Sequence, residues 1–136
     1  MSEVLAQLEK KGTTFQETVL WTNPNPTSTS GFAGANVSLD DNISNYAYIK
    51  FLTNYNAWNT SKVIEICIKA DEFTNYIDGN GMYTPGFFIQ GSDGTQYWRY
   101  LTYVSDTVVH FSSAINRASG AITNANVIPY QIIGIK

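Results

Sequence analysis

The chain has 136 residues, enough for one domain that buries about two-thirds of its unfolded surface. Charged residues make up only 14% of the sequence and the formal net charge is −3, so the chain lacks the basic character of a nucleic-acid-binding protein. No apolar run approaches the roughly 20 residues of a membrane-spanning helix, and the single cysteine, Cys67, has no partner for an internal disulfide.

The first 14 residues are expected to form a short helix and a linker in front of the main domain, which spans 15–136. Val4, Leu5 and Leu8 would share one face of that helix. Two interpretations stay open. The helix is frayed, because short isolated helices are weak, or its apolar face contacts a neighbouring subunit or a larger particle.

The rest of the chain consists of short segments with alternating apolar and polar residues, separated by turn residues about every ten positions. In the clearest segment Ile64, Ile66 and Ile68 face one side, and Glu65 and Cys67 face the other. The segments expected to be strands are 17–22, 35–39, 46–53, 62–69, 86–90, 95–104, 107–113 and 122–135. This pattern predicts an all-β fold, an antiparallel β-sandwich with a jelly-roll-like arrangement.

Prolines mark two irregular points in this pattern. Pro24 and Pro26 lack an amide N–H and end the first strand, in which Val19 and Trp21 are expected to share a face. Pro129 interrupts the last strand, which predicts either an edge position or a bulge there.

The sequence contains no evident catalytic constellation. His110 is the only histidine and is expected to point away from the core, although the abundant serines and aspartates leave a Ser-His-Asp triad open. The neighbouring carboxylates Asp40-Asp41 and Asp71-Glu72 are typical of solvated turns rather than of the separated acid pair that glycoside hydrolysis needs. We therefore expect no enzymatic activity, no cofactor and no bound metal.

Aromatic residues are more numerous than a small core requires, with nine Tyr, seven Phe and three Trp. The segment 95–104 is aromatic on both faces, with Tyr97 on one and Trp98 and Tyr100 on the other. This predicts a strand that is central in its sheet or covered by a partner subunit.

Trp58 lies in a polar segment that is expected to be a loop. An aromatic side chain beside asparagines offers a flat apolar face for a sugar ring and polar groups for its hydroxyls. For any one such aromatic, anchoring the loop to the core is the commoner role. The candidate ligand-binding residues are Tyr55, Asn56, Trp58, Asn59, Asp78, Asn80 and Tyr83. Asp78 and Asn80 also resemble the start of a calcium loop, but the later ligand positions do not fit and a turn is favoured.

The segments 17–27 (ETVLWTNPNPT) and 128–136 (IPYQIIGIK), together with the residues of 39–41 and 46–50, resemble small structural proteins of bacteriophages and prophages. These are fibre, tail or receptor-binding-type domains from phages of Gram-positive bacteria. The shared residues are framework residues and carry no catalytic signature.

The resemblance implies a homotrimeric module on the virion surface that contacts other virion proteins through its N-terminal segment and attaches to a host cell-surface glycan. Synthesis in the host cytoplasm without a signal peptide, followed by release on lysis, agrees with it. The alternatives are a stand-alone carbohydrate-binding, lectin-like bacterial domain and, less favoured, a glycan hydrolase.

Overall fold

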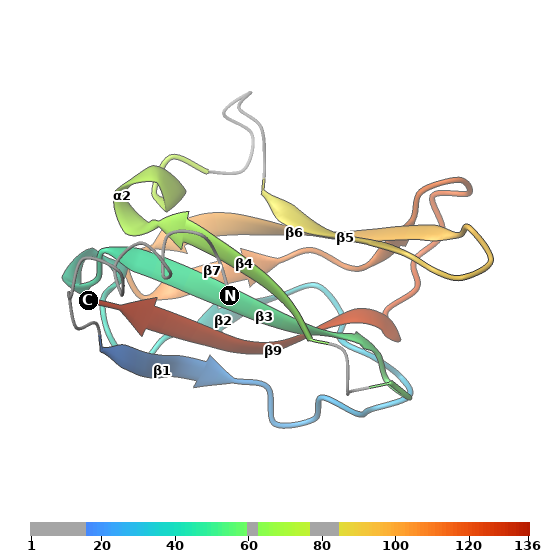
Figure 1. Ribbon diagram of the computed structural model, residues 1–136, viewed down its shortest axis with the longest axis horizontal. Helices are drawn as coiled ribbons and strands as arrows, with labels where there is room; N and C mark the ends of the chain where they lie inside the picture. The colour runs from blue at the N-terminus through green and yellow to red at the C-terminus, as the bar shows by residue number, and fades with distance from the viewer. Residues whose placement is uncertain (1–15, 60–62, 77–84) are drawn as a thin grey trace, which may run out of the picture.

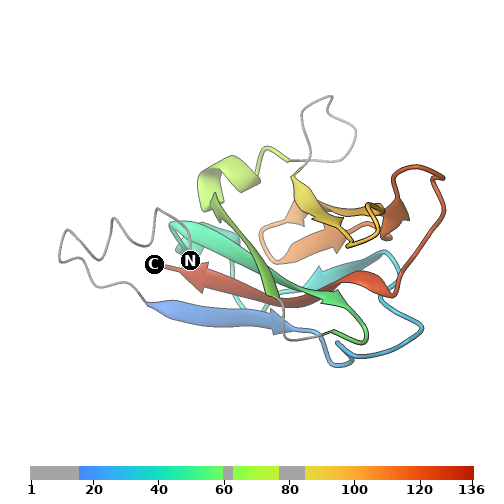
Figure 2. The ribbon, with the colours of Figure 1, turned by 45° about the vertical axis from the view of Figure 1, so that its right-hand side comes forward.

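The computed structural model describes residues 16–59, 63–76 and 85–136, and these form two antiparallel sheets that face each other (Figures 1 and 2). One sheet has the strand order β1-β9-β3-β4. The other has the order β2-β7-β6-β5, with the short β8 also paired to β6. The elements are β1 (Glu17–Thr22), β2 (Ala35–Ser38), η1 (Ile43–Asn45), β3 (Tyr48–Asn56), β4 (Val63–Lys69), α2 (Ala70–Phe73), β5 (Gly86–Gln90), β6 (Gln96–Ser105), β7 (Val108–Phe111), β8 (Ile115–Asn116) and β9 (Asn126–Ile135).

The all-β, antiparallel class predicted from the sequence is confirmed. The connections β3–β4, β5–β6, β6–β7 and β7–β8 stay within one sheet, while the other connections pass between the sheets. The jelly-roll description stays a prediction. The predicted N-terminal helix, with Val4, Leu5 and Leu8, lies outside the described residues.

The core lies between the two sheets because alternate residues of each strand point inward. Phe51 of β3 and Ile132 of β9 come from one sheet, and Leu101 of β6 and Val109 of β7 from the other; all are fully buried. The inward-facing isoleucines predicted for β4 pack against the same core. Phe73 of the short helix α2 joins them, with its ring centroid 5.1 Å from that of Phe51.

The first strand contains a bulge that the sequence pattern did not reveal. The register of β1 against β9 shifts between Val19 and Trp21, so Leu20 is fully buried and Val19 is 47% exposed. Trp21 instead packs against Phe111, with 5.6 Å between the ring centroids. The prediction that Val19 and Trp21 share a face is therefore wrong, because one extra residue offsets the alternation.

Pro129 lies in β9, which is a central strand between β1 and β3. The register of β3 against β9 shifts between Leu52 and Thr53, and Thr53 pairs with Pro129. Of the two predicted roles for Pro129, the bulge is confirmed and the edge position is wrong. Asn23 secures the corner after β1 here, since its side-chain amide donates a hydrogen bond to the carbonyl of Pro129 at 2.8 Å.

Strand β6 is central, as its two aromatic faces predicted, with β5 on one side and β7 and β8 on the other. Its inner face carries Arg99, which is fully buried. The guanidinium donates hydrogen bonds to the carbonyl of Val127 at 2.7 Å and to that of Ser112 at 2.6 Å. Longer bonds reach the carbonyls of Asn126 and Asn124, at 3.3 and 3.5 Å.

Burial lowers the pKa of Arg99 to about 9, so the side chain keeps its positive charge at pH 7. Phe32 covers the guanidinium, with its ring centroid 5.3 Å from Cζ. No carboxylate among the described residues pairs with this charge. The charge is therefore stabilised by backbone carbonyl groups. These carbonyls belong to the chain segments on either side of β8 and to the start of β9.

Candidate ligand-binding surface

The connections after β1, β3, β5 and β8 gather at one end of the molecule (Figure 1). Segment 124–126 joins three of them through backbone hydrogen bonds: Phe32 N–H donates to the carbonyl of Asn124, and Ala57 N–H donates to that of Ala125, both at 2.9 Å. Arg99 binds the carbonyls of the same segment from inside the core. The loops at this end are thus tied to one another and to the core.

Trp58 projects from this end and is 70% exposed. Its backbone is fixed, because the side-chain oxygen of Asn56 accepts hydrogen bonds from the N–H groups of Trp58 at 3.0 Å and Asn59 at 2.7 Å. Ala57, which lies between Asn56 and Trp58 in the sequence, is buried. The structure therefore places a large, solvent-exposed indole on a turn that is held by hydrogen bonds.

The other predicted ligand residues of this loop have different positions. Tyr55 packs against the core, and its hydroxyl lies about 3.0 Å from where a side chain at Gly91 would begin, so it supports the β5–β6 turn. Asn56 uses its side-chain oxygen within the turn. The predicted residues Asp78, Asn80 and Tyr83 lie outside the described residues.

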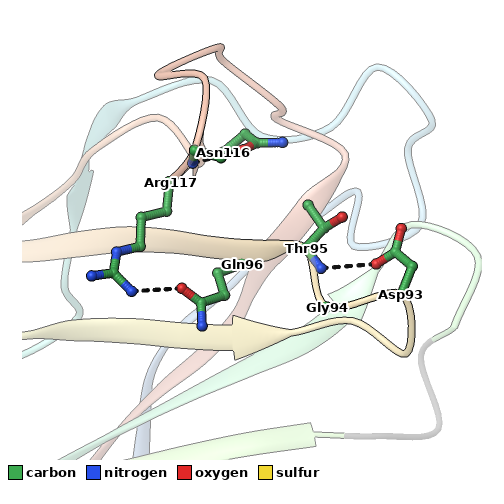
Figure 3. Close-up of a pocket in the computed structure, with 7 residues that line it drawn as sticks. Asp93, Gly94, Thr95, Gln96, Asn116 and Arg117 are labelled. Carbon is green, nitrogen blue, oxygen red and sulfur yellow. Dashed lines mark hydrogen bonds between the residues drawn. The ribbon is translucent and has the colours of Figure 1, made fainter.

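A shallow polar depression of about 510 Å³ lies beside the β5–β6 turn (Figure 3). Asp93 accepts a hydrogen bond from the N–H of Thr95 at 2.9 Å, and bonds to Thr95 lower the pKa of this carboxyl. On the other side Arg117 donates to the side-chain oxygen of Gln96 at 2.7 Å. The depression is thus lined by one acidic side chain, one basic side chain and the amides of Gln96 and Asn116.

An aromatic surface on the outer face of β5 and β6 adjoins this depression, and none of its residues is among the predicted ligand-binding residues. Trp98 lies opposite Phe88 in the register, with ring centroids 6.4 Å apart, and 5.5 Å from Tyr100 along its own strand. Phe88 is 50% exposed. The sequence indicates this surface only through the second aromatic face of segment 95–104, which predicts either a central strand or a strand covered by a partner subunit.

His110, the histidine considered for a catalytic triad, makes a hydrogen bond to an asparagine. His110 alternates outward between the buried Val109 and Phe111, and its Nδ1 lies 2.7 Å from the side-chain oxygen of Asn36 rather than from a carboxylate. Within the described ranges, no cluster of three His, Cys, Asp or Glu side chains is placed to hold a metal ion.

Asp41 serves a turn. Its carboxylate accepts hydrogen bonds from the hydroxyl of Tyr46 at 2.8 Å, from the N–H of Asn42 at 2.8 Å and from the side chain of Asn45 at 2.9 Å. These bonds, that from Tyr46 foremost, lower the pKa of Asp41. The carboxylate therefore stabilises the η1 region through these three hydrogen bonds.

The chain was compared with protein-family models and with curated proteins, and neither comparison gave a match. No helix in the described part of the chain is long and apolar enough to cross a membrane.

Proposed function

We propose that this domain is a non-catalytic module of a bacteriophage particle that attaches the particle to a glycan on the bacterial surface. The observation that carries the proposal is Trp58, a 70% exposed indole on a turn fixed by Asn56. The resemblance of segments 17–27 and 128–136 to phage structural proteins supports the setting on a virion.

A pinned, exposed indole suits a sugar because its flat face covers the C–H groups of a pyranose ring without competing for the hydroxyls. Pinning the loop before binding lowers the entropy that the complex must lose. In the proposal three copies assemble on the virion, so that several weak sites engage one cell surface together and the overall avidity exceeds the single-site affinity.

A glycan array probed with the purified domain and with Trp58→Ala tests the binding role. We expect the wild type to bind a subset of bacterial glycans on the array. Trp58→Ala should bind them about tenfold more weakly, a loss of roughly 1.4 kcal/mol in binding free energy. Trp58→Tyr is the matched control, because it keeps an aromatic face on the same turn and should retain most of the binding. Equal binding by wild type and Trp58→Ala would remove Trp58 as the site.

A further inference from the structure

The outer face of the β5–β6–β8 sheet carries an ordered pattern of side chains that neither the core nor the loop end uses. One cross-strand row is apolar. It runs from Phe88 through Trp98 to Ile115, which pair in register, and continues to Ile122, which bridges to Ile115. Phe88 is 50% exposed and Ile122 is 67% exposed.

The indole of Trp98 is the centre of this row and presents carbon rather than nitrogen to the outside. Its Nε1 is covered, while the side chain as a whole is only partly buried. Tyr100 flanks it on one side, supported by the close approach of its ring to Gly86, where an added Cβ would lie 3.3 Å from Cδ1. Phe88, Trp98 and Tyr100 thus form a surface of three rings at the sheet face.

The next cross-strand row is polar. Gln90 pairs with Gln96, and their side-chain amides lie 3.3 Å apart. Arg117 follows on the other side, with its backbone N–H bonded to the carbonyl of Gln96 and its Nη1 bonded to the side-chain oxygen of the same residue (Figure 3). Among the described residues, the exposed guanidinium makes this side-chain hydrogen bond and no ion pair, so it has further N–H groups for a ligand.

We propose that this face is a second carbohydrate-binding site, in which a sugar ring stacks on Trp98 and its hydroxyls bond to Gln90, Gln96 and Arg117. The proposal rests on the glycan-binding function above and adds a site to it. A row of apolar rings directly beside a row of amide and guanidinium groups matches the two kinds of surface of a pyranose. Because antiparallel pairing sets adjacent rows about two residues apart on one face, one sugar can reach both.

The site is tested by titrating the wild-type domain, Trp98→Ala, Trp58→Ala and the double variant with an oligosaccharide selected on the array. We expect Trp98→Ala to lower the affinity about tenfold and Arg117→Gln about threefold. Trp98→Ala and Trp58→Ala should each weaken one site and leave the other at its wild-type affinity, and the double variant should weaken both, since separate sites with no shared contacts are independent. Val104→Ala is the control, because Val104 is 50% exposed on the same strand, six residues from Trp98.

Chemical-shift changes in wild-type protein provide a measurement that needs no variant. The sugar should shift the side-chain amides of Gln90 and Gln96 and the ring signals of Trp98. Binding that depends on Trp58 but leaves these signals and the Trp98→Ala affinity unchanged would overturn the second site and leave the proposed function standing. A wild type that binds no glycan would overturn both. Loss of self-association in Trp98→Ala, with sugar binding unchanged, would show that the face is a protein interface instead.

Discussion

Arg99 donates its Nε–H to the carbonyl oxygen of Val127 across 2.7 Å, and both residues are fully buried. Val127 has a φ of 51°, the only positive φ at a non-glycine residue among those described. A β-branched residue in this region is strained by about 1–3 kcal/mol. The buried guanidinium thus holds the chain where β9 begins in a conformation that the residue alone disfavours.

Arg99→Met is expected to lower the free energy of unfolding by at least about 3 kcal/mol. The methionine fills similar space but leaves the carbonyls of Ser112 and Val127 buried without donors, and each such group costs about 1–3 kcal/mol. Urea denaturation measures the loss. Arg117→Met is the control, since Arg117 is exposed and its replacement should change stability by less than about 0.5 kcal/mol. An Arg99→Met variant as stable as the wild type would show that these bonds do not hold the fold.

Gly134→Ala is expected to destabilise the protein by about 1–3 kcal/mol, because an added Cβ would lie 2.6–2.7 Å from ring atoms of Tyr46. Tyr46 is buried and its ring lies over this glycine of β9. A double-mutant cycle with Tyr46→Ala isolates the clash, since the alanine at 134 should cost less once the ring is gone. Equal costs of Gly134→Ala in the two backgrounds would contradict the packing described.

The stability of the η1 region should depend on pH through Asp41. Hydrogen bonds, that from Tyr46 foremost, lower its pKa in the folded state below the usual value of 3.8, so its stabilising effect is present above about pH 4 and is lost as the pH falls through the folded pKa. Asp41→Asn should therefore lose less stability than the wild type between pH 5 and pH 2. Asp40→Asn is the control, because its side chain makes none of the three bonds of Asp41. Parallel pH profiles for wild type and Asp41→Asn would be inconsistent with this role.

Multi-angle light scattering addresses the oligomeric state that the proposal requires. We expect a molar mass about three times the 15.1 kDa of one chain, at micromolar concentration. A monomer would count against the virion module and favour the stand-alone lectin-like alternative, whose sites act singly.

Among the described strands, all but the two-residue β8 (Ile115–Asn116) were predictable, because their signals are local. The alternation at β4 depends on residues next to one another and appears as expected. The role of Arg99 was not predictable, since its partners lie 13 to 28 residues away and charge alone suggests a surface position. The bulge near Leu20 escaped for the same reason: it is defined by pairing with β9 at the other end of the chain.

The candidate surfaces divide in the same way. The sequence left two roles open for the aromatic residues of this loop, with anchoring to the core the commoner one. The structure exposes Trp58, whereas Tyr55 packs against the core. The apolar row of Phe88, Trp98 and Ile115 was foreseeable only in part. The sequence shows the aromatic outer face of β6, but the alignment of the three side chains depends on the cross-strand register of β5, β6 and β8.

Immunogold labelling of phage particles purified from a lysate in which this chain is detected is the most direct test of the proposed virion location. Antibodies against the purified domain, checked for binding to the folded protein, would be applied to intact purified virions. We expect the gold label at a defined position on the particle surface. Intact particles that carry no label, while the same antibodies detect the protein in the lysate, would contradict it.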